Sequence, residues 1–110
     1  MSKDFVNKKC APCEGGVAPL VREEAILYLA EVLGWEISVN SKQISRDFKF
    51  DNFKEAMKFV NSVADIAEEE GHHPDINISY NKVKFTNSTH AIGGLSENDF
   101  ILAAKINRLR

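Results

Sequence analysis

The chain has 110 residues, 44% of them hydrophobic, which predicts one globular domain with a single modest core. Its formal net charge is -2, with Lys and Arg scattered among Asp and Glu, so direct binding of nucleic acid is not expected. No stretch approaches the roughly 20 apolar residues that cross a bilayer, and residues 1–6 lack the apolar block of a secretion signal, so we expect a soluble cytoplasmic protein without membrane contact.

Residues 1–20 are predicted to form an irregular N-terminal arm, because Pro and Gly recur there, and residues 21–110 to form the single domain. The arm contains both cysteines of the chain, Cys10 and Cys13, in a C-x-x-C spacing. This spacing suits two reduced thiols, a weak metal site or a disulfide, and no second C-x-x-C completes a zinc site.

The first predicted helix covers residues 22–33, and Gly34 can close it as a left-handed cap. Its apolar positions follow the i, i+3, i+4, i+7 spacing of one helix face: Ile26, Leu29, Ala30 and Leu33. Residues 35–39 and 44–50 then alternate apolar with polar side chains, which is typical of two half-buried strands, although Arg46 interrupts the second.

The strongest local pattern is an apolar helical stripe between residues 53 and 67. Asn52 and Glu55 resemble a capping box at its start, and Gly71 suits its end. The acidic run at residues 68–70 is typical of a solvated helix end.

A β-hairpin is predicted next, with strands over residues 76–80 and 83–85 joined by a two-residue turn at Asn81 and Lys82. Ser96 then starts a final helix, with Asp99 at the third position of a capping box. The element order is therefore α-β-β-α-β-β-α. We expect an α+β fold in which a four-stranded antiparallel sheet carries three helices on one face.

The three histidines of the chain, His72, His73 and His90, flank this hairpin. Antiparallel pairing across the turn folds residue 73 back towards residue 90, at one end of the sheet. Imidazole has an unperturbed pKa of roughly 6.5, so it serves as both acid and base near neutral pH. The sequence therefore predicts a histidine cluster at the end of the sheet.

Three explanations fit such a cluster. Three histidines can hold zinc, although adjacent residues of an extended segment point to opposite sides, which makes it difficult for His72 and His73 to share one ion. The histidines can also be surface or capping residues without a chemical task. Finally, they can carry out acid-base catalysis or bind a substrate in a pocket.

Segments on both sides of the cluster resemble a known family. Around the histidines they are GHHPDI at 71–76, SYNKV at 79–83, STH at 88–90 and GLSEND at 94–99. Upstream they are CEGG at 13–16, GWE at 34–36 and FDNFKEA at 50–56. From Cys10 onward, the chain resembles the pterin-4a-carbinolamine dehydratases, and bacterial members in particular.

The resemblance implies a lyase that needs no metal and no organic cofactor. It would remove water from 4a-hydroxytetrahydrobiopterin to give quinonoid dihydrobiopterin, in tetrahydrobiopterin recycling. By carry-over from the family, His72, His73 and His90 are catalytic, and we expect His72 and His90 to transfer protons while His73 orients the substrate. The resemblance also implies six substrate-binding positions: Glu68, Pro74, Thr89, Ala91, Ile92 and Asp99.

Two of these positions have an alternative interpretation, since Asp99 can serve only as a helix cap and Glu68 can be solvated. Three departures concern the pocket: Ile76 stands where animal members carry Trp, Asn87 where an aliphatic residue is usual, and Asn98 where animal members carry a basic residue. They change positions around the expected pterin site, but none of them removes a histidine.

The family forms dimers and tetramers, so a homodimer or homotetramer is expected, and the open edges of the sheet offer a route to it. Animal members also bind a transcription factor. Two alternatives to the dehydratase function are therefore a protein-binding role, as coactivator or assembly factor, and a role in another pterin pathway such as that of molybdopterin.

Overall fold

The computed structural model describes residues 4–11 and 17–110. Cys13 lies outside this part, so the pairing and metal hypotheses for the C-x-x-C motif stay predictions. The elements in chain order are η1 (Phe5–Asn7), α1 (Arg22–Leu29), β1 (Glu36–Ile37), β2 (Ile44–Lys49), α2 (Phe53–Glu70), β3 (Asp75–Ser79), β4 (Lys82–Asn87), η2 (His90–Ile92) and α3 (Glu97–Leu109).

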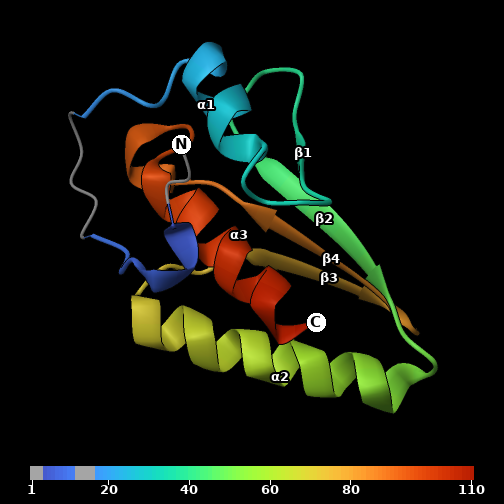
Figure 1. The fold of residues 1–110 in the computed structure, drawn as a ribbon. Helices are drawn as coiled ribbons and strands as arrows, with labels where there is room; N and C mark the ends of the chain where they lie inside the picture. The colour runs from blue at the N-terminus through green and yellow to red at the C-terminus, as the bar shows by residue number, and fades with distance from the viewer. Residues whose placement is uncertain (1–3, 12–16) are drawn as a thin grey trace.

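The four strands form one antiparallel sheet in the order β1-β2-β4-β3, with the helices on one side of it (Figure 1). This confirms the predicted α+β fold and its α-β-β-α-β-β-α order. The core lies between the sheet and the helices, where Val83 and Phe85 of β4 meet Val63 of α2 and Leu102 of α3. No helix in the described residues is both long enough and apolar enough to span a bilayer.

The first helix differs from its prediction. It ends at Leu29, and the side chains that it buries are Ala25 within the helix and Val32 in the turns after it, whereas Ile26 and Leu33 are exposed. Apolar residues occur around most of this short helix, so periodicity alone could not select the buried side. Tyr28 decides it, because its ring packs edge-on against Phe100 of α3, with 5.5 Å between the ring centroids.

The first strand is also shorter than predicted. It covers only Glu36 and Ile37, and the exposed Val39 belongs to a turn instead. In that turn the Ser38 hydroxyl accepts hydrogen bonds from the backbone N–H groups of Lys42 and Gln43. Such side-chain-to-backbone hydrogen bonds compete with strand pairing, which explains the early end of β1.

Arg46, which interrupts the alternation of β2, lies on the helix-covered side of the sheet. Its guanidinium donates to the backbone carbonyl of Leu33 and to the side chain of Asn107 in α3, and it lies 4.4 Å from the centroid of the Phe48 ring. Gly34 passes directly over this group, and an added Cβ there would meet Arg46 Nε at 2.7 Å. The arginine therefore joins β2 to the helical layer.

The two later helices begin as predicted. The Asn52 side chain accepts from the backbone N–H of Glu55 at 2.9 Å, and Gly71 ends α2 with a φ of 67°. At the start of α3 the carboxylate of Asp99 accepts from the backbone N–H of Ser96 at 2.9 Å, which completes the capping box. The end of α2 at Gly71 and the start of α3 at Ser96 therefore fix both sides of the segment that carries the histidines.

Strand β3 forms an edge of the sheet, and every one of its residues is exposed. Ile76 pairs with Phe85 and Ile78 with Val83, so both isoleucines face the helix-covered side. Each is nevertheless 38% exposed, because α2 lies over β4 rather than over this edge. The sheet thus ends in a partly uncovered apolar margin.

The described part of the N-terminal arm is attached to the domain. Phe5 is buried in the core beside Phe100, and Lys8 forms an ion pair of 2.7 Å with Glu97 at the start of α3. The division into an arm and a domain at residue 20 stays a prediction.

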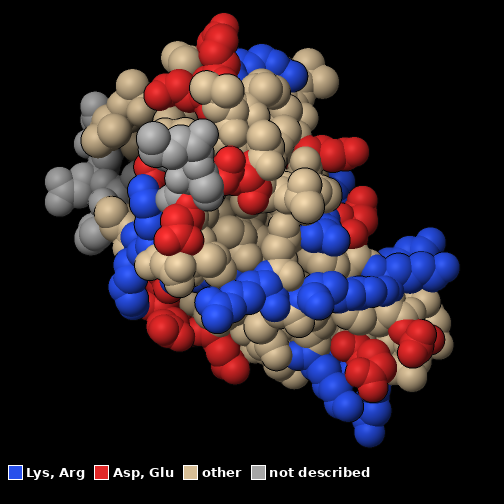
Figure 2. Space-filling model, in the orientation of Figure 1, with Lys and Arg blue, Asp and Glu red and all other residues tan. Residues whose placement is uncertain are grey.

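Figure 2 shows that residues of both charge signs occupy the face on the helix side.

Candidate active site

A cavity of about 490 Å³ lies at the end of the sheet where α2 stops and β4 ends. All three histidines line it, together with Gly71, Ser88, Thr89, Ala91, two arm residues (Cys10 and Ala11) and two polar residues (Glu70 and Asn98). Its volume is within the range of sites that hold small organic ligands. The cluster expected from the hairpin is therefore formed around a space that a ligand can enter.

Local backbone geometry brings the histidines to this end of the sheet. Gly71 takes the left-handed conformation that closes α2, and His72 follows it, with its backbone N–H donating to the carbonyl of Ala67 at 3.2 Å. On the other side, Thr89 and Gly94 pair as an isolated bridge, which closes the loop that starts with His90. The two histidine segments are therefore held by a helix cap and by a bridged loop.

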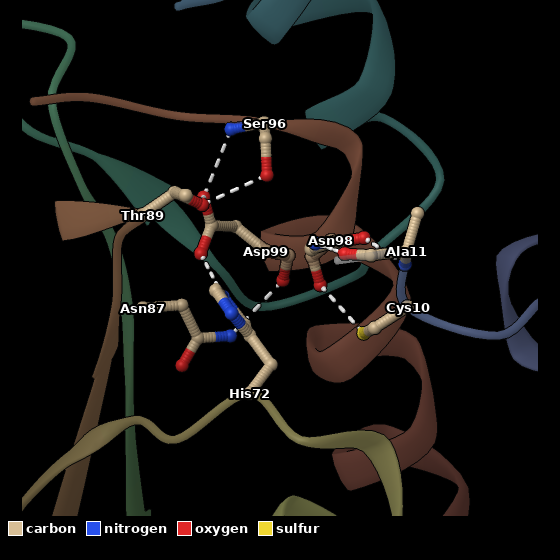
Figure 3. Close-up of polar contacts among 8 residues, drawn as sticks. All are labelled: Cys10, Ala11, His72, Asn87, Thr89, Ser96, Asn98 and Asp99. Carbon is tan, nitrogen blue, oxygen red and sulfur yellow. Dashed lines mark hydrogen bonds and ion pairs between the residues drawn. The ribbon is translucent and has the colours of Figure 1, made fainter. Parts of the chain in front are cut away.

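His72 is held by a buried carboxylate (Figure 3). Its Nε2 lies 2.6 Å from Oδ1 of Asp99, and the Asp99 side chain is 0% exposed. The other oxygen, Oδ2, accepts from the Thr89 hydroxyl at 2.8 Å and from the Ser96 backbone N–H at 2.9 Å. A carboxylate fixed in this way is an acceptor for an Nε2 proton of His72, and in the neutral imidazole this arrangement leaves the lone pair on Nδ1.

The other two histidines are held less firmly. His73 contacts Glu68 through Nε2 and Oε2 at 2.5 Å, but these side chains are 59% and 77% exposed. His90 is exposed, and its ring makes no hydrogen bond to another residue within the described ranges. Water competes with exposed ion pairs, so His72 is the most strongly oriented histidine of the three.

The sequence-predicted residues fall into two groups. His72, His73, His90, Thr89 and Ala91 line the cavity. Four lie outside the lining. Pro74 and Ile92 belong to the segments that carry His73 and His90, while Glu68 and Asp99 bind His73 and His72.

Sequence reasoning missed several lining residues. Cys10 and Ala11 belong to the arm, for which no contact could be predicted, and Asn98 appeared only as a departure from animal relatives. Nothing in the sequence marks the arm as part of a pocket. The C-x-x-C spacing predicted two reduced thiols, a weak metal site or a disulfide, and none of these implies contact with a ligand cavity.

Glu70 corrects the interpretation of the acidic run at residues 68–70. Glu68 and Glu69 are solvated as expected, but the Glu70 side chain is only 2% exposed. Its carboxylate accepts from Lys105 Nζ at 2.6 Å and from the backbone N–H of Cys10 at 2.9 Å. Burial acts to raise the pKa of Glu70, but these two hydrogen bonds and the Lys105 charge outweigh it, and the pKa is lowered.

The thiol of Cys10 is protonated at neutral pH. Burial, followed by the charge of Glu70, raises the pKa of Cys10 to about 12. Its Sγ lies 3.6 Å from the backbone carbonyl of Asn98, to which it donates. In this state it is a poor nucleophile and a poor metal ligand. Within the described residues, no three His, Cys, Asp or Glu side chains are grouped to bind a metal.

Replacing Glu70 with Gln should lower the free energy of unfolding at pH 7 by about 1.5 kcal/mol, because the charge is lost from a buried hydrogen-bonded carboxylate. The folded-state pKa of Glu70 is lowered, so its contribution is complete above the ordinary glutamate pKa of roughly 4.3 and disappears as the pH falls through the folded-state value. Urea unfolding between pH 3 and 7 measures this difference. Glu69→Gln is the matched control, and equal curves for the two variants would contradict the prediction.

Asn87, another departure from the family, lies beside this network (Figure 3). It is fully buried, and its Nδ2 donates to the backbone carbonyl of Asp99 at 3.0 Å. Its Oδ1 has no hydrogen-bond partner among the described residues. The residue thus joins β4 to the first turn of α3 next to the carboxylate that holds His72.

Known proteins resemble this chain along almost its whole length. Residues 18–109 match the family model described as pterin 4 alpha carbinolamine dehydratase. A protein of Nitrosomonas eutropha, provisionally named as a pterin-4-alpha-carbinolamine dehydratase, is 50% identical over 107 residues, covering 96% of this chain and 93% of its own.

Two solved structures share the fold. A transcriptional coactivator/pterin dehydratase from Brucella melitensis is 34% identical, with a TM-score of 0.79 over 83% of this chain and 97% of its own. A pterin dehydratase-like protein, identified as a RuBisCO assembly factor in the alpha-carboxysome, is 23% identical, with a TM-score of 0.60 over 69% of this chain and 88% of its own. The second likeness extends to the fold alone.

Proposed function

Since this chain belongs to the pterin 4 alpha carbinolamine dehydratase family, we propose that it dehydrates 4a-hydroxytetrahydrobiopterin to quinonoid dihydrobiopterin by histidine acid-base catalysis. The observation that carries the proposal is His72, held by the buried Asp99 in a cavity that His73 and His90 also line. The reaction would serve the recycling of tetrahydrobiopterin.

The chemistry requires two proton transfers. The C4a–O bond breaks as the hydroxyl accepts a proton and leaves as water, while a ring nitrogen loses its proton and its electron pair forms the new C=N bond. Acid and base catalysis of such steps contributes roughly 10²–10⁴-fold each. Imidazoles near neutrality provide both functions.

We assign the two transfers to His72 and His90. Asp99 holds Nε2 of His72, so its Nδ1 is the basic atom that takes the ring-nitrogen proton. His90 makes no competing hydrogen bond among the described residues, which suits an acid that delivers a proton to the leaving hydroxyl. His73 orients the pterin, and its exposed contact with Glu68 allows the ring to adjust.

The remaining family positions support the ligand and the histidines. Thr89 and Ala91 line the cavity and would contact the pterin through their backbone groups, because the Thr89 hydroxyl is already bonded to Asp99. Pro74 and Ile92 would bind substrate only as part of the segments that carry the histidines. Asp99 and Glu68 would act through His72 and His73.

A direct assay tests the proposal. The substrate is generated in situ by an aromatic amino-acid hydroxylase, and quinonoid dihydropterin is followed by stopped-flow absorbance. We expect the purified chain to accelerate its formation well above the uncatalysed rate, and a triple Ala variant of His72, His73 and His90 to lose the acceleration. An unchanged rate with the folded wild-type protein would refute the enzyme function.

We also propose that the protein is a homodimer or homotetramer that pairs through β3. A domain of this size buries only about 60–65% of its unfolded surface, and β3 leaves a strand edge with Ile76 and Ile78 partly uncovered.

Ile78→Lys should therefore shift the protein to monomer in sedimentation experiments at micromolar concentration, because a buried unpaired charge at the interface is unfavourable. Asn77→Lys, which places the charge on the opposite side of the same strand, is the control. A wild type that sediments only as a monomer would contradict the proposal.

A second candidate function is a protein-binding role as coactivator or assembly factor. The name of the Brucella melitensis structure, a transcriptional coactivator/pterin dehydratase, favours it, and the exposed β3 edge gives it a surface. A role in another pterin pathway, such as that of molybdopterin, would keep the same cavity. The triple histidine variant separates the protein-binding role from the roles that use the cavity, since a purely protein-binding function survives the loss of the imidazoles.

A further inference from the structure

The wall of the cavity formed by Cys10 and Ala11 comes from the N-terminal arm, far in sequence from every histidine. Three hydrogen bonds hold its backbone, and Figure 3 shows Cys10 and Ala11 beside Asn98. The Cys10 backbone N–H donates to Glu70 at 2.9 Å. The Asn98 side chain accepts from the Ala11 backbone N–H at 2.9 Å and donates to the Ala11 carbonyl at 2.7 Å.

These contacts are made by buried side chains, so they hold the arm in a fixed position on the domain. The Asn98 residue is only 7% exposed and the Glu70 side chain only 2%. Both bind the backbone of the arm, and the amide of Asn98 pairs with Ala11 at two points, as a neighbouring strand would. Polar groups are buried at a cost unless they are bonded, so the arm and its two partners depend on each other.

The wall itself is uncharged. Cys10 is held as a neutral thiol that donates to the Asn98 carbonyl, and Ala11 adds only a methyl group. It faces a cavity whose other lining groups are imidazoles, polar side chains and backbone. An uncharged wall of this kind suits van der Waals contact with a flat heterocycle.

We propose that Cys10 and Ala11, fastened by Asn98 and Glu70, form a specificity wall of the pterin site. The inference rests on the proposed function. The wall contacts no reacting atom, so it binds the substrate and the transition state equally. Uniform binding of this kind appears in KM and leaves kcat unchanged.

Asn98→Leu removes both bonds to Ala11 with a side chain of similar size. When the arm occupies its position only part of the time, the apparent affinity falls in proportion. We expect KM to rise about 10-fold, with kcat within about twofold of wild type. Asn61→Leu, at an exposed position of α2, is the matched control. An unchanged KM, or a fall in kcat alone, would overturn the inference.

Ala11→Leu gives a second test that does not depend on the folding of Asn98→Leu. Both bonds of Ala11 involve its backbone, so this variant keeps the attachment and changes only the wall. We expect KM to rise several-fold while the urea midpoint stays at the wild-type value. Equal KM values for Ala11→Leu and wild type would count against a wall that contacts the ligand.

A binding experiment separates this inference from the proposed function. In a Cys13→Ser background, iodoacetamide should modify Cys10 slowly, 7,8-dihydrobiopterin should slow it further, and Asn98→Leu should accelerate it about 10-fold. Absence of turnover by the wild type would refute the proposed function, whereas protection by the pterin would still support the wall. Turnover without any protection of Cys10 would refute the wall alone.

Discussion

Replacing His72 with Ala should lower kcat for pterin dehydration by about 10²–10⁴-fold, the contribution of one positioned acid-base group. His72 is the histidine whose orientation is fixed, because its Nε2 lies 2.6 Å from a carboxylate that solvent does not reach. His73 and His90 line the same cavity but are exposed, so neither provides a base in a fixed position. Stopped-flow formation of quinonoid dihydropterin measures the loss.

His73→Ala is the comparison for this prediction, because it removes an adjacent imidazole with an exposed partner. We expect it to raise KM more than it lowers kcat. Near-normal turnover by His72→Ala would mean that the base is another group, and the assignment of Nδ1 would have to be abandoned. A comparable loss of kcat in His73→Ala would show that His73 also takes part in proton transfer, which contradicts its orienting role.

The second large effect is expected for Asp99→Asn. Donors from His72, Thr89 and Ser96 all converge on this carboxylate, and an amide offers one oxygen where two are needed. We expect kcat to fall by about 10²-fold, because the amide no longer holds the same tautomer of His72. The free energy of unfolding should fall by about 2 kcal/mol with the loss of charged hydrogen bonds.

Stability and activity can be separated with a double variant. His72→Ala alone leaves the buried Asp99 carboxylate without its imidazole partner, so it lowers the free energy of unfolding as well as kcat. Adding Asp99→Asn to His72→Ala should therefore cost less stability than the sum of the two single changes, while the activity stays at the level of His72→Ala. Additive losses of stability would show that the pair is not coupled.

Asp99 also illustrates why one residue can look like a cap and a site residue in sequence. It occupies the third position of α3, where a carboxylate closes a capping box, and its Oδ2 does so. Its Oδ1 is then free to bind His72. The same carboxylate performs both tasks because the two oxygens point to different elements, and no spacing rule reveals the second task.

Local signals in the sequence determined much of this protein. Caps at Asn52, Gly71 and Ser96 set the ends of the two long helices, and the alternation of apolar residues set the strands. Hairpin pairing then brought the segments of His72 and His90 to one end of the sheet. The predicted turn was wrong by one residue, because Ser79 pairs with Lys82 and the turn lies at Tyr80, which has a φ of 52°, and Asn81. These features depend on interactions between near neighbours in the chain, which is why residue order alone is enough to predict them.

Only the tertiary structure decided which polar and apolar groups are buried. Ile76 and Ile78 have the alternation of core residues but lie beyond the cover of α2, whereas Glu70 ends an acidic run and is buried by Lys105 and the arm. The wall at Cys10 and Ala11 exists because Asn98, far along the chain, binds their backbone. Burial depends on contacts between distant segments, and a local pattern carries no information about which distant segment will arrive.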